Sequence, residues 1–154
     1  MFINKSTISV SDLVVARHIL EPSIAHTAAL NVTNEDILKL QDNLQSMKDN
    51  LRNGDAFISA DQQFHMNVAL ATKNKILYVM ARTIVESLTI LRTTVYEIPG
   101  APEQAIHRHQ EIIDALKAHD ANRSFAVMEQ HILDSDGRQH LNLMKNSLEI
   151  LNHV

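Results

Sequence analysis

Asp61 and His65 form a candidate metal-binding pair, because both side chains leave a predicted helix on the same side, one turn apart. Asp61 belongs to an otherwise apolar stripe with spacings of 4, 3 and 4 residues: Phe57, Asp61, Phe64 and Val68. A buried carboxylate is unfavourable unless it is paired or coordinates a metal ion. The stripe therefore predicts that Asp61 has a partner inside the protein.

Two further histidines occupy similar inward positions. His109 shares a stripe with Ile113 and Leu116, and His131 lies beside Met128. Transition metals accept imidazole and carboxylate ligands together. Four protein ligands would complete a tetrahedral zinc site, whereas an octahedral ion would keep two positions for water or ligand oxygens. We predict one divalent transition metal, with zinc as the first choice and nickel, manganese or iron as alternatives.

For any single histidine, the alternative is a core side chain satisfied by an ordinary hydrogen bond. The joint inward placement of the set, with an aspartate that needs a partner, favours the metal site. The remaining histidines that lack this support are interpreted as surface or locally hydrogen-bonded residues: His18, His26, His107, His140 and His153.

Arg17 is a second charged residue on an apolar stripe, which also contains Leu13, Leu20 and Ile24. A buried guanidinium needs an anion, ideally a carboxylate that accepts two hydrogen bonds. Two partners remain open. One is Glu21, one turn along the helix, and the other is a bound carboxylate ligand that also touches the metal.

The composition limits the class of protein. The chain has 154 residues, 45% of them hydrophobic, which fits one globular domain with a real core. The absence of cysteine excludes disulfides and thiolate zinc sites. The formal charge is −4, with no cluster of basic residues, so nucleic-acid binding by this chain alone is disfavoured. No apolar run reaches the roughly 18 residues of a membrane span, and we expect a soluble, cytoplasmic protein.

Only three glycines and three prolines interrupt the chain, which favours long helices. We expect residues 1–10 to be an irregular lead-in or linker remnant. Ser11 is predicted to cap a first helix to about residue 30, with a kink or broken turn at Pro22. Thr33 and Asp36 resemble a capping box that opens a second helix. Asp55 is predicted to cap the third helix, to about residue 72.

Asn74 is predicted to cap a fourth helix, whose apolar stripe continues to about residue 95. A fifth helix should run from Pro102 to about residue 119. Asp120 or Asn122 should cap the next, with a kink or a break near Gly137. Residues 11–154 are thus predicted to form a single all-α antiparallel bundle of six or seven helices.

Four short motifs follow one another along residues 11–150. They are Arg17-x-x-Leu20-Glu21-Pro22, Asp61-x-x-Phe64-His65, His109-x-x-Ile112-x-x-Ala115-Leu116 and Met128-x-x-His131-Ile132. The ordered set resembles the FCD domain, the C-terminal effector-binding and dimerisation domain of FadR-type regulators in the GntR family.

The resemblance implies one metal ion bound by Asp61, His65, His109 and His131, in a pocket for a small organic acid that Arg17 can face. It also implies a homodimer. DNA would be bound only through an N-terminal winged helix-turn-helix, which we do not expect within this chain. Arg108 departs from the family, which often has glutamate there, and so changes the local charge.

The first hypothesis for function is therefore a ligand sensor in transcription regulation rather than an enzyme. One alternative is a metal-dependent helical-bundle hydrolase, for which the adjacent His119 and Asp120 would be a candidate pair. The other alternative is a structural dimerisation module in which the metal only joins helices.

Overall fold

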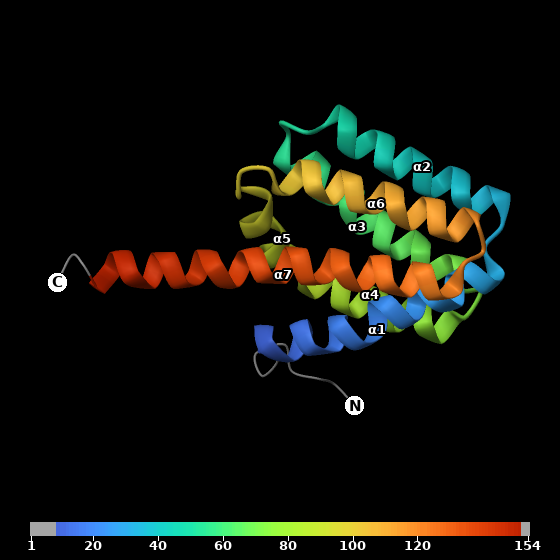
Figure 1. Cartoon of the computed structure of the whole chain (residues 1–154), viewed down its shortest axis with the longest axis horizontal. Helices are drawn as coiled ribbons and strands as arrows, with labels where there is room; N and C mark the ends of the chain where they lie inside the picture. Colours follow the sequence, from blue (N-terminus) through green and yellow to red (C-terminus); the bar gives the residue numbers. More distant parts are fainter. Residues whose placement is uncertain (1–8, 152–154) are drawn as a thin grey trace.

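A computed structural model describes the backbone of residues 9–151 and the side chains of residues 9–137. Within this part of the chain there are seven α-helices and no β-strand, and they pack as one bundle (Figure 1). The helices are α1 (Val10–Asn31), α2 (Asn34–Asp49), α3 (Gly54–Ala71), α4 (Lys75–Ser87), α5 (Thr89–Tyr96), α6 (Ala101–Lys117) and α7 (Ala121–Leu151). The predicted all-α bundle is confirmed. The side chains of His140 and His153 lie outside the described residues.

Two predicted helix starts are wrong by two residues. Ser9, not Ser11, caps α1, because only Ser9 has an aspartate three residues on, Asp12, to complete a capping box. Asn53, not Asp55, caps α3, with its side chain accepting the backbone N–H of Ala56. Thr33 with Asp36 and Asn74 cap α2 and α4 as predicted.

Pro22 does not break α1, which is continuous from Val10 to Asn31. A proline removes only one N–H from the helix ladder. Buried neighbours on both sides of it, including Glu21 and Ile24, hold this stretch against the bundle. The broken turn predicted there is therefore wrong.

The predicted fourth helix is two helices, α4 and α5, separated at Leu88. The backbone of Leu88 leaves the helical region, with φ −96° and ψ 13°. The hydroxyl of Thr89 donates to the carbonyl oxygen of Glu86, a local bond that competes with regular helix geometry. The break turns α5 so that its side chains reach a different part of the bundle from those of α4.

Gly100 precedes α6 in a left-handed conformation, with φ 79°, which glycine adopts without strain. Helix α6 ends at Lys117, two residues before the predicted end. Asp120 accepts the backbone N–H of Arg123 and so caps α7, as predicted. Near Gly137 we predicted a kink or a break. The break is wrong, because α7 is one helix from Ala121 to Leu151.

Helix α1 packs mainly against α7, α2 against α3, and α6 against both α2 and α7 (Figure 1). The main core lies between them and is formed by aliphatic side chains, Phe64 and a run of alanines on α1. Ala25, Ala28 and Ala29 are fully buried, which lets α1 approach its neighbours closely. None of the helices in the described range is both long and apolar enough to cross a membrane.

Candidate functional site

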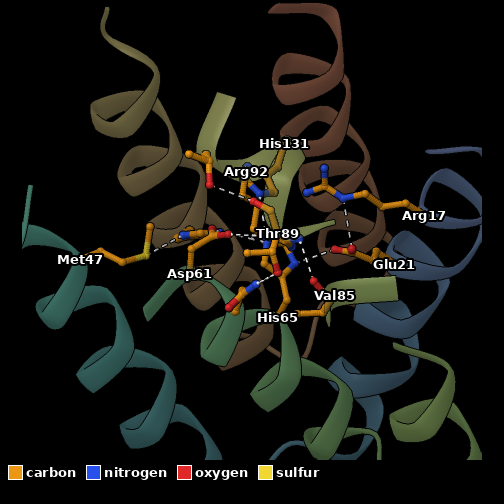
Figure 2. A network of polar contacts seen from close by, with 12 residues as sticks. Arg17, Glu21, Met47, Asp61, His65, Val85, Thr89, Arg92 and His131 are labelled. Carbon is orange, nitrogen blue, oxygen red and sulfur yellow. Dashed lines mark hydrogen bonds and ion pairs between the residues drawn. The ribbon is translucent and has the colours of Figure 1, made fainter. Parts of the chain in front are cut away.

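The four predicted ligands meet inside the bundle. Helix α3 supplies Asp61 and His65, α6 supplies His109, and α7 supplies His131. All four are buried, and one ligand atom from each lies within 4.8 Å of the others. The Nε2 atom of His109 is 3.3 Å from Oδ1 of Asp61, and the Nε2 atoms of His65 and His131 are 3.3 Å apart (Figure 2). One ion could therefore be reached by all four residues.

The donor set fits a transition metal ion. One carboxylate oxygen and three imidazole nitrogens are ligands that zinc, nickel, manganese and iron accept. The Nε2 atom of His109 is buried and has no hydrogen-bond partner among the described residues. An unpaired buried nitrogen costs free energy, and coordination to a metal would remove that cost.

Glu21 orients His65 from the side opposite to the other ligands. Its Oε2 atom lies 2.6 Å from Nδ1 of His65, whereas Nε2 of His65 faces Asp61 Oδ1 at 3.6 Å. A proton on Nδ1 leaves the lone pair of Nε2 for a metal ion. Carboxylates commonly fix the tautomer and direction of metal-binding histidines in this way.

The pKa values of the cluster follow from burial and from its charges. Burial lowers the pKa of His65, but the carboxylates of Glu21 and Asp61 outweigh it, and the net pKa is raised. Burial would raise the pKa of Asp61, yet His65 and Arg92 hold that pKa well below its ordinary value. Burial lowers the pKa of His109 to about 3. Its imidazole is therefore neutral and able to act as a ligand near neutral pH.

Packing fixes the ring of His109 as well. Phe64 stacks on it, with ring centroids 4.1 Å apart and planes inclined by 27°. The sulfur of Met47 lies 3.2 Å from its Nδ1 atom. His109 is fully buried between these groups, so its Nε2 atom can point only toward Asp61.

Arg17 is buried, as predicted, and it lies beside the cluster. Its Nε atom donates to Glu21 at 3.1 Å, and its Nη1 atom donates to Asp136 at 3.2 Å. Glu21 is therefore the partner that the sequence offered. Asp136, on α7, is a second partner that the sequence did not indicate, and it also contacts His18 at 2.6 Å.

Arg92 is a member of the cluster that the sequence interpretation missed. It lies on α5 and is buried, and its Nε atom donates to Oδ2 of Asp61 at 2.7 Å (Figure 2). Its position next to Leu91, within the apolar stripe that includes Leu88 and Val95, was the available signal.

A cavity opens beside the four ligands. It is bordered by α1, α3, α5, α6 and α7, and Asp61 and His131 form part of its wall. Three arginines from three helices also border it: Arg17, Arg92 and Arg108. Its other side is apolar, with Phe57, Val95 and Tyr96 among the lining residues. Asp134 also lines the cavity and accepts a hydrogen bond from Arg108, so the wall combines charged groups of both signs with apolar ones.

The adjacent pair His119 and Asp120 has structural roles away from this cavity. The Nδ1 atom of His119 is 2.9 Å from the carbonyl oxygen of Ala29, and Asp120 caps α7. Neither residue belongs to the buried group of four.

Comparisons with known proteins agree on one family. The FCD domain family model matches residues 12–134. The Uxu operon regulator of Haemophilus influenzae is 30% identical over 135 residues, covering 79% of this chain and 47% of that protein. The HTH-type transcriptional repressor NanR of Escherichia coli is 28% identical over 124 residues, covering 75% of this chain and 45% of that protein. The chain thus spans about half the length of these relatives.

Solved structures share the fold. A GntR protein of Streptococcus agalactiae matches with a TM-score of 0.70 and 24% identity, covering 84% of this chain and 60% of that one. The E. coli protein McbR/YncC matches with a TM-score of 0.71 and 19% identity, covering 90% of this chain and 68% of that one. At these identities the likeness concerns the arrangement of helices.

Proposed function

This chain belongs to the FCD domain family, whose model matches residues 12–134, and we propose that it is the ligand-sensing and dimerisation domain of a bacterial GntR/FadR-type transcription regulator. Residues 11–154 would form this domain. In the complete regulator, a separate N-terminal domain would bind DNA. The relatives reported above are named as regulators of transcription, which favours a regulatory role over an enzymatic one.

The observation that carries the proposal is the convergence of Asp61, His65, His109 and His131 within 4.8 Å. These residues would hold one divalent transition metal ion, with zinc as the first choice. The metal would supply a Lewis-acidic centre that binds oxygen atoms of a ligand. Glu21 would keep the imidazole of His65 directed at the ion.

The charge of the surrounding network favours an anionic effector. Three carboxylates and two guanidiniums form its contacts and are nearly excluded from solvent: Glu21, Asp61, Asp136, Arg17 and Arg92. Imidazoles that bind a metal are neutral, so the charged groups of this network then sum to one excess negative charge, and a divalent ion changes the sum to one excess positive charge. Buried charge is costly unless it is compensated. A small carboxylate in the cavity would restore neutrality, with Arg17 as one of its contacts.

Dimerisation would use an apolar surface on α1 and α4, which contact each other. Large side chains there are exposed, among them Val15 and Ile19 on α1 and Ile76 and Val79 on α4. Exposed apolar surface of this kind is typical of protein interfaces. An effector that favours one arrangement of the helices would then change the geometry of the dimer, and so DNA binding by the N-terminal domains.

Metal analysis of the purified protein tests the first half of the proposal. We expect one equivalent of metal in the unaltered protein, and loss of it in His109→Ala and His131→Ala. His107→Ala is the matched control, because His107 is exposed on the same helix as His109. Protein that contains no metal, and whose stability is the same with and without added zinc, would contradict the proposal.

Thermal shift tests the second half. A ligand that binds only the native state raises its stability. We expect some members of a panel of small di- and hydroxy-carboxylates to raise the Tm of the metal-loaded protein, and to raise it less after chelation. If the Tm of the metal-loaded protein responds to none of them, the result would favour a structural module in which the metal only joins helices. Four protein ligands would also suit such a structural metal site.

A further inference from the structure

Arg92 has one nitrogen, Nη2, that donates no hydrogen bond within the described part of the chain. The side chain is 7% exposed, and its Nη2 atom is buried with no hydrogen-bond partner among the described residues. Unsatisfied buried donors are rare in folded proteins, and those of a charged group are the most costly. The Nη2 atom therefore needs an acceptor that the described residues do not provide.

The other nitrogens of Arg92 determine where that acceptor must be. Nε donates to Oδ2 of Asp61 at 2.7 Å, and Nη1 donates to the carbonyl oxygen of Val85 at 3.4 Å. These two bonds hold the planar guanidinium in one orientation. The remaining nitrogen, Nη2, belongs to the same planar group as the Nε atom that donates to Asp61.

Arg92 also borders the cavity described above. Asp61 and His131 form part of the same wall, and Figure 2 shows the three residues in close-up. The unpaired donor is thus beside two of the candidate metal ligands. A carboxylate that places one oxygen toward the metal and the other toward Arg92 would satisfy both groups. Guanidinium and carboxylate are well matched for such a contact.

We propose that Arg92 is an effector-anchoring residue, whose Nη2–H donates to the carboxylate of a small acid bound at the same time to the metal. This inference rests on the proposed function. It also assigns a second task to the same side chain, because Nε of Arg92 holds Asp61 in place as a metal ligand. Metal and effector should therefore bind cooperatively, each raising the affinity of the other by the same factor.

The test compares Arg92→Gln and Arg92→Lys with the unaltered protein at saturating zinc, so that an effect on metal affinity alone cannot lower the signal. Calorimetry measures binding of acetate, glycolate, malonate and malate, with malonamide as an uncharged control. Arg82→Gln is the matched control, since Arg82 is exposed on α4 and pairs with Glu86 on the same helix. Zinc content is measured for every variant.

We expect Arg92→Gln to bind the tightest acid of the panel about 10- to 100-fold more weakly, the usual effect of losing a hydrogen bond to a charged group. Arg82→Gln should stay within about twofold, because its surface pair contributes little. Arg92→Lys should bind more weakly than the unaltered protein but retain full zinc, since lysine keeps the charge without the planar fork. If Arg92→Gln fails to fold, Arg92→Lys decides.

Three outcomes would overturn the inference. Equal acid affinity in the unaltered protein and in the folded Arg92 variants would mean that a buried water or nothing accepts the Nη2–H. Weaker acid binding that merely follows a lower zinc content of the Arg92 variants would reduce Arg92 to a support for Asp61. If the unaltered, zinc-loaded protein binds no member of the panel, the proposed carboxylate effector fails, and the inference fails with it.

Discussion

The bundle has an apolar core and a polar cluster of charged residues and histidines. The same helices contribute side chains to both. On α1, α3 and α6 most of the main apolar core follows the polar cluster along the chain. His65 precedes Val68 on α3, and His109 precedes Ile113 on α6. On helix α7 the main core has residues on both sides of His131, namely Met128 and Ile132.

In the apolar region, the identity of each side chain matters through its volume and its burial. In the polar cluster, the effect of a substitution depends on which charged or polar partner loses its contact. Arg17 has Glu21 and Asp136, and Arg92 has Asp61. Removing one partner of a buried ion pair leaves the other charge without compensation, which is unfavourable. We therefore expect substitutions in the apolar core to alter stability alone, and those in the polar cluster to alter both stability and metal binding.

The largest effect should come from Leu116→Ala. Leu116 is fully buried in the main core, so its truncation should lower the free energy of unfolding by about 2–5 kcal/mol. Urea unfolding measures this change. Leu116→Met is the control and should cost less than about 1.5 kcal/mol, because it conserves volume. A competition titration with a chelator should find the zinc affinity of Leu116→Ala unchanged. A parallel loss of zinc affinity would show that the regions are not separable.

Zinc itself should stabilise the protein. At about 100 times its dissociation constant, zinc should raise the free energy of unfolding by about 2.7 kcal/mol, because it binds only the folded cluster. His131→Ala should lose this increment, whereas Leu116→Ala should keep it. Urea unfolding with and without zinc provides the measurement. An equal increment in His131→Ala would place the bound zinc elsewhere.

Glu21→Gln should weaken zinc binding by about 10- to 100-fold, the usual effect of losing a carboxylate that orients a metal-binding histidine. The physical reason is the 2.6 Å contact between Glu21 and Nδ1 of His65. Chelator competition measures the affinity. Glu35→Gln is the matched control, because Glu35 is an exposed residue on α2 that pairs with Lys39. Similar affinities in the two variants would contradict an orienting role for Glu21.

The smallest effect concerns Asp36, which lies in neither region. It completes the cap of α2 and pairs with Lys73. Burial opposes ionisation of its carboxyl group, but hydrogen bonds from Lys73 and Thr33 outweigh burial, so the pKa of Asp36 is lowered. Asp36→Asn should cost about 1 kcal/mol at neutral pH. A lowered pKa stabilises the fold above the ordinary aspartate pKa, and this contribution disappears as the pH falls through the folded pKa. The difference between the two proteins should therefore shrink below about pH 4. A difference that does not change with pH would contradict this sign.

Sequence patterns were sufficient for the residues that interrupt an apolar stripe. Asp61, His109 and Arg17 were found in this way, and the structure buries all three. Pairing between distant helices is not encoded in local spacing, so Asp136 could not be assigned to Arg17. The break at Leu88 was also hidden, because the apolar period continues across it and neither glycine nor proline marks it.

Helix α7 extends past its neighbours in Figure 1, and His131 lies in its first half. At about 1.5 Å per residue, the backbone from His131 to Leu151 measures about 30 Å. A helix of that length that moves as one body converts a small tilt near one end into a larger displacement at the other. A tilt of about two degrees at the fulcrum moves the tip by about 1 Å, so a displacement too small to see at the ligands becomes a shift of atomic size at the distal end.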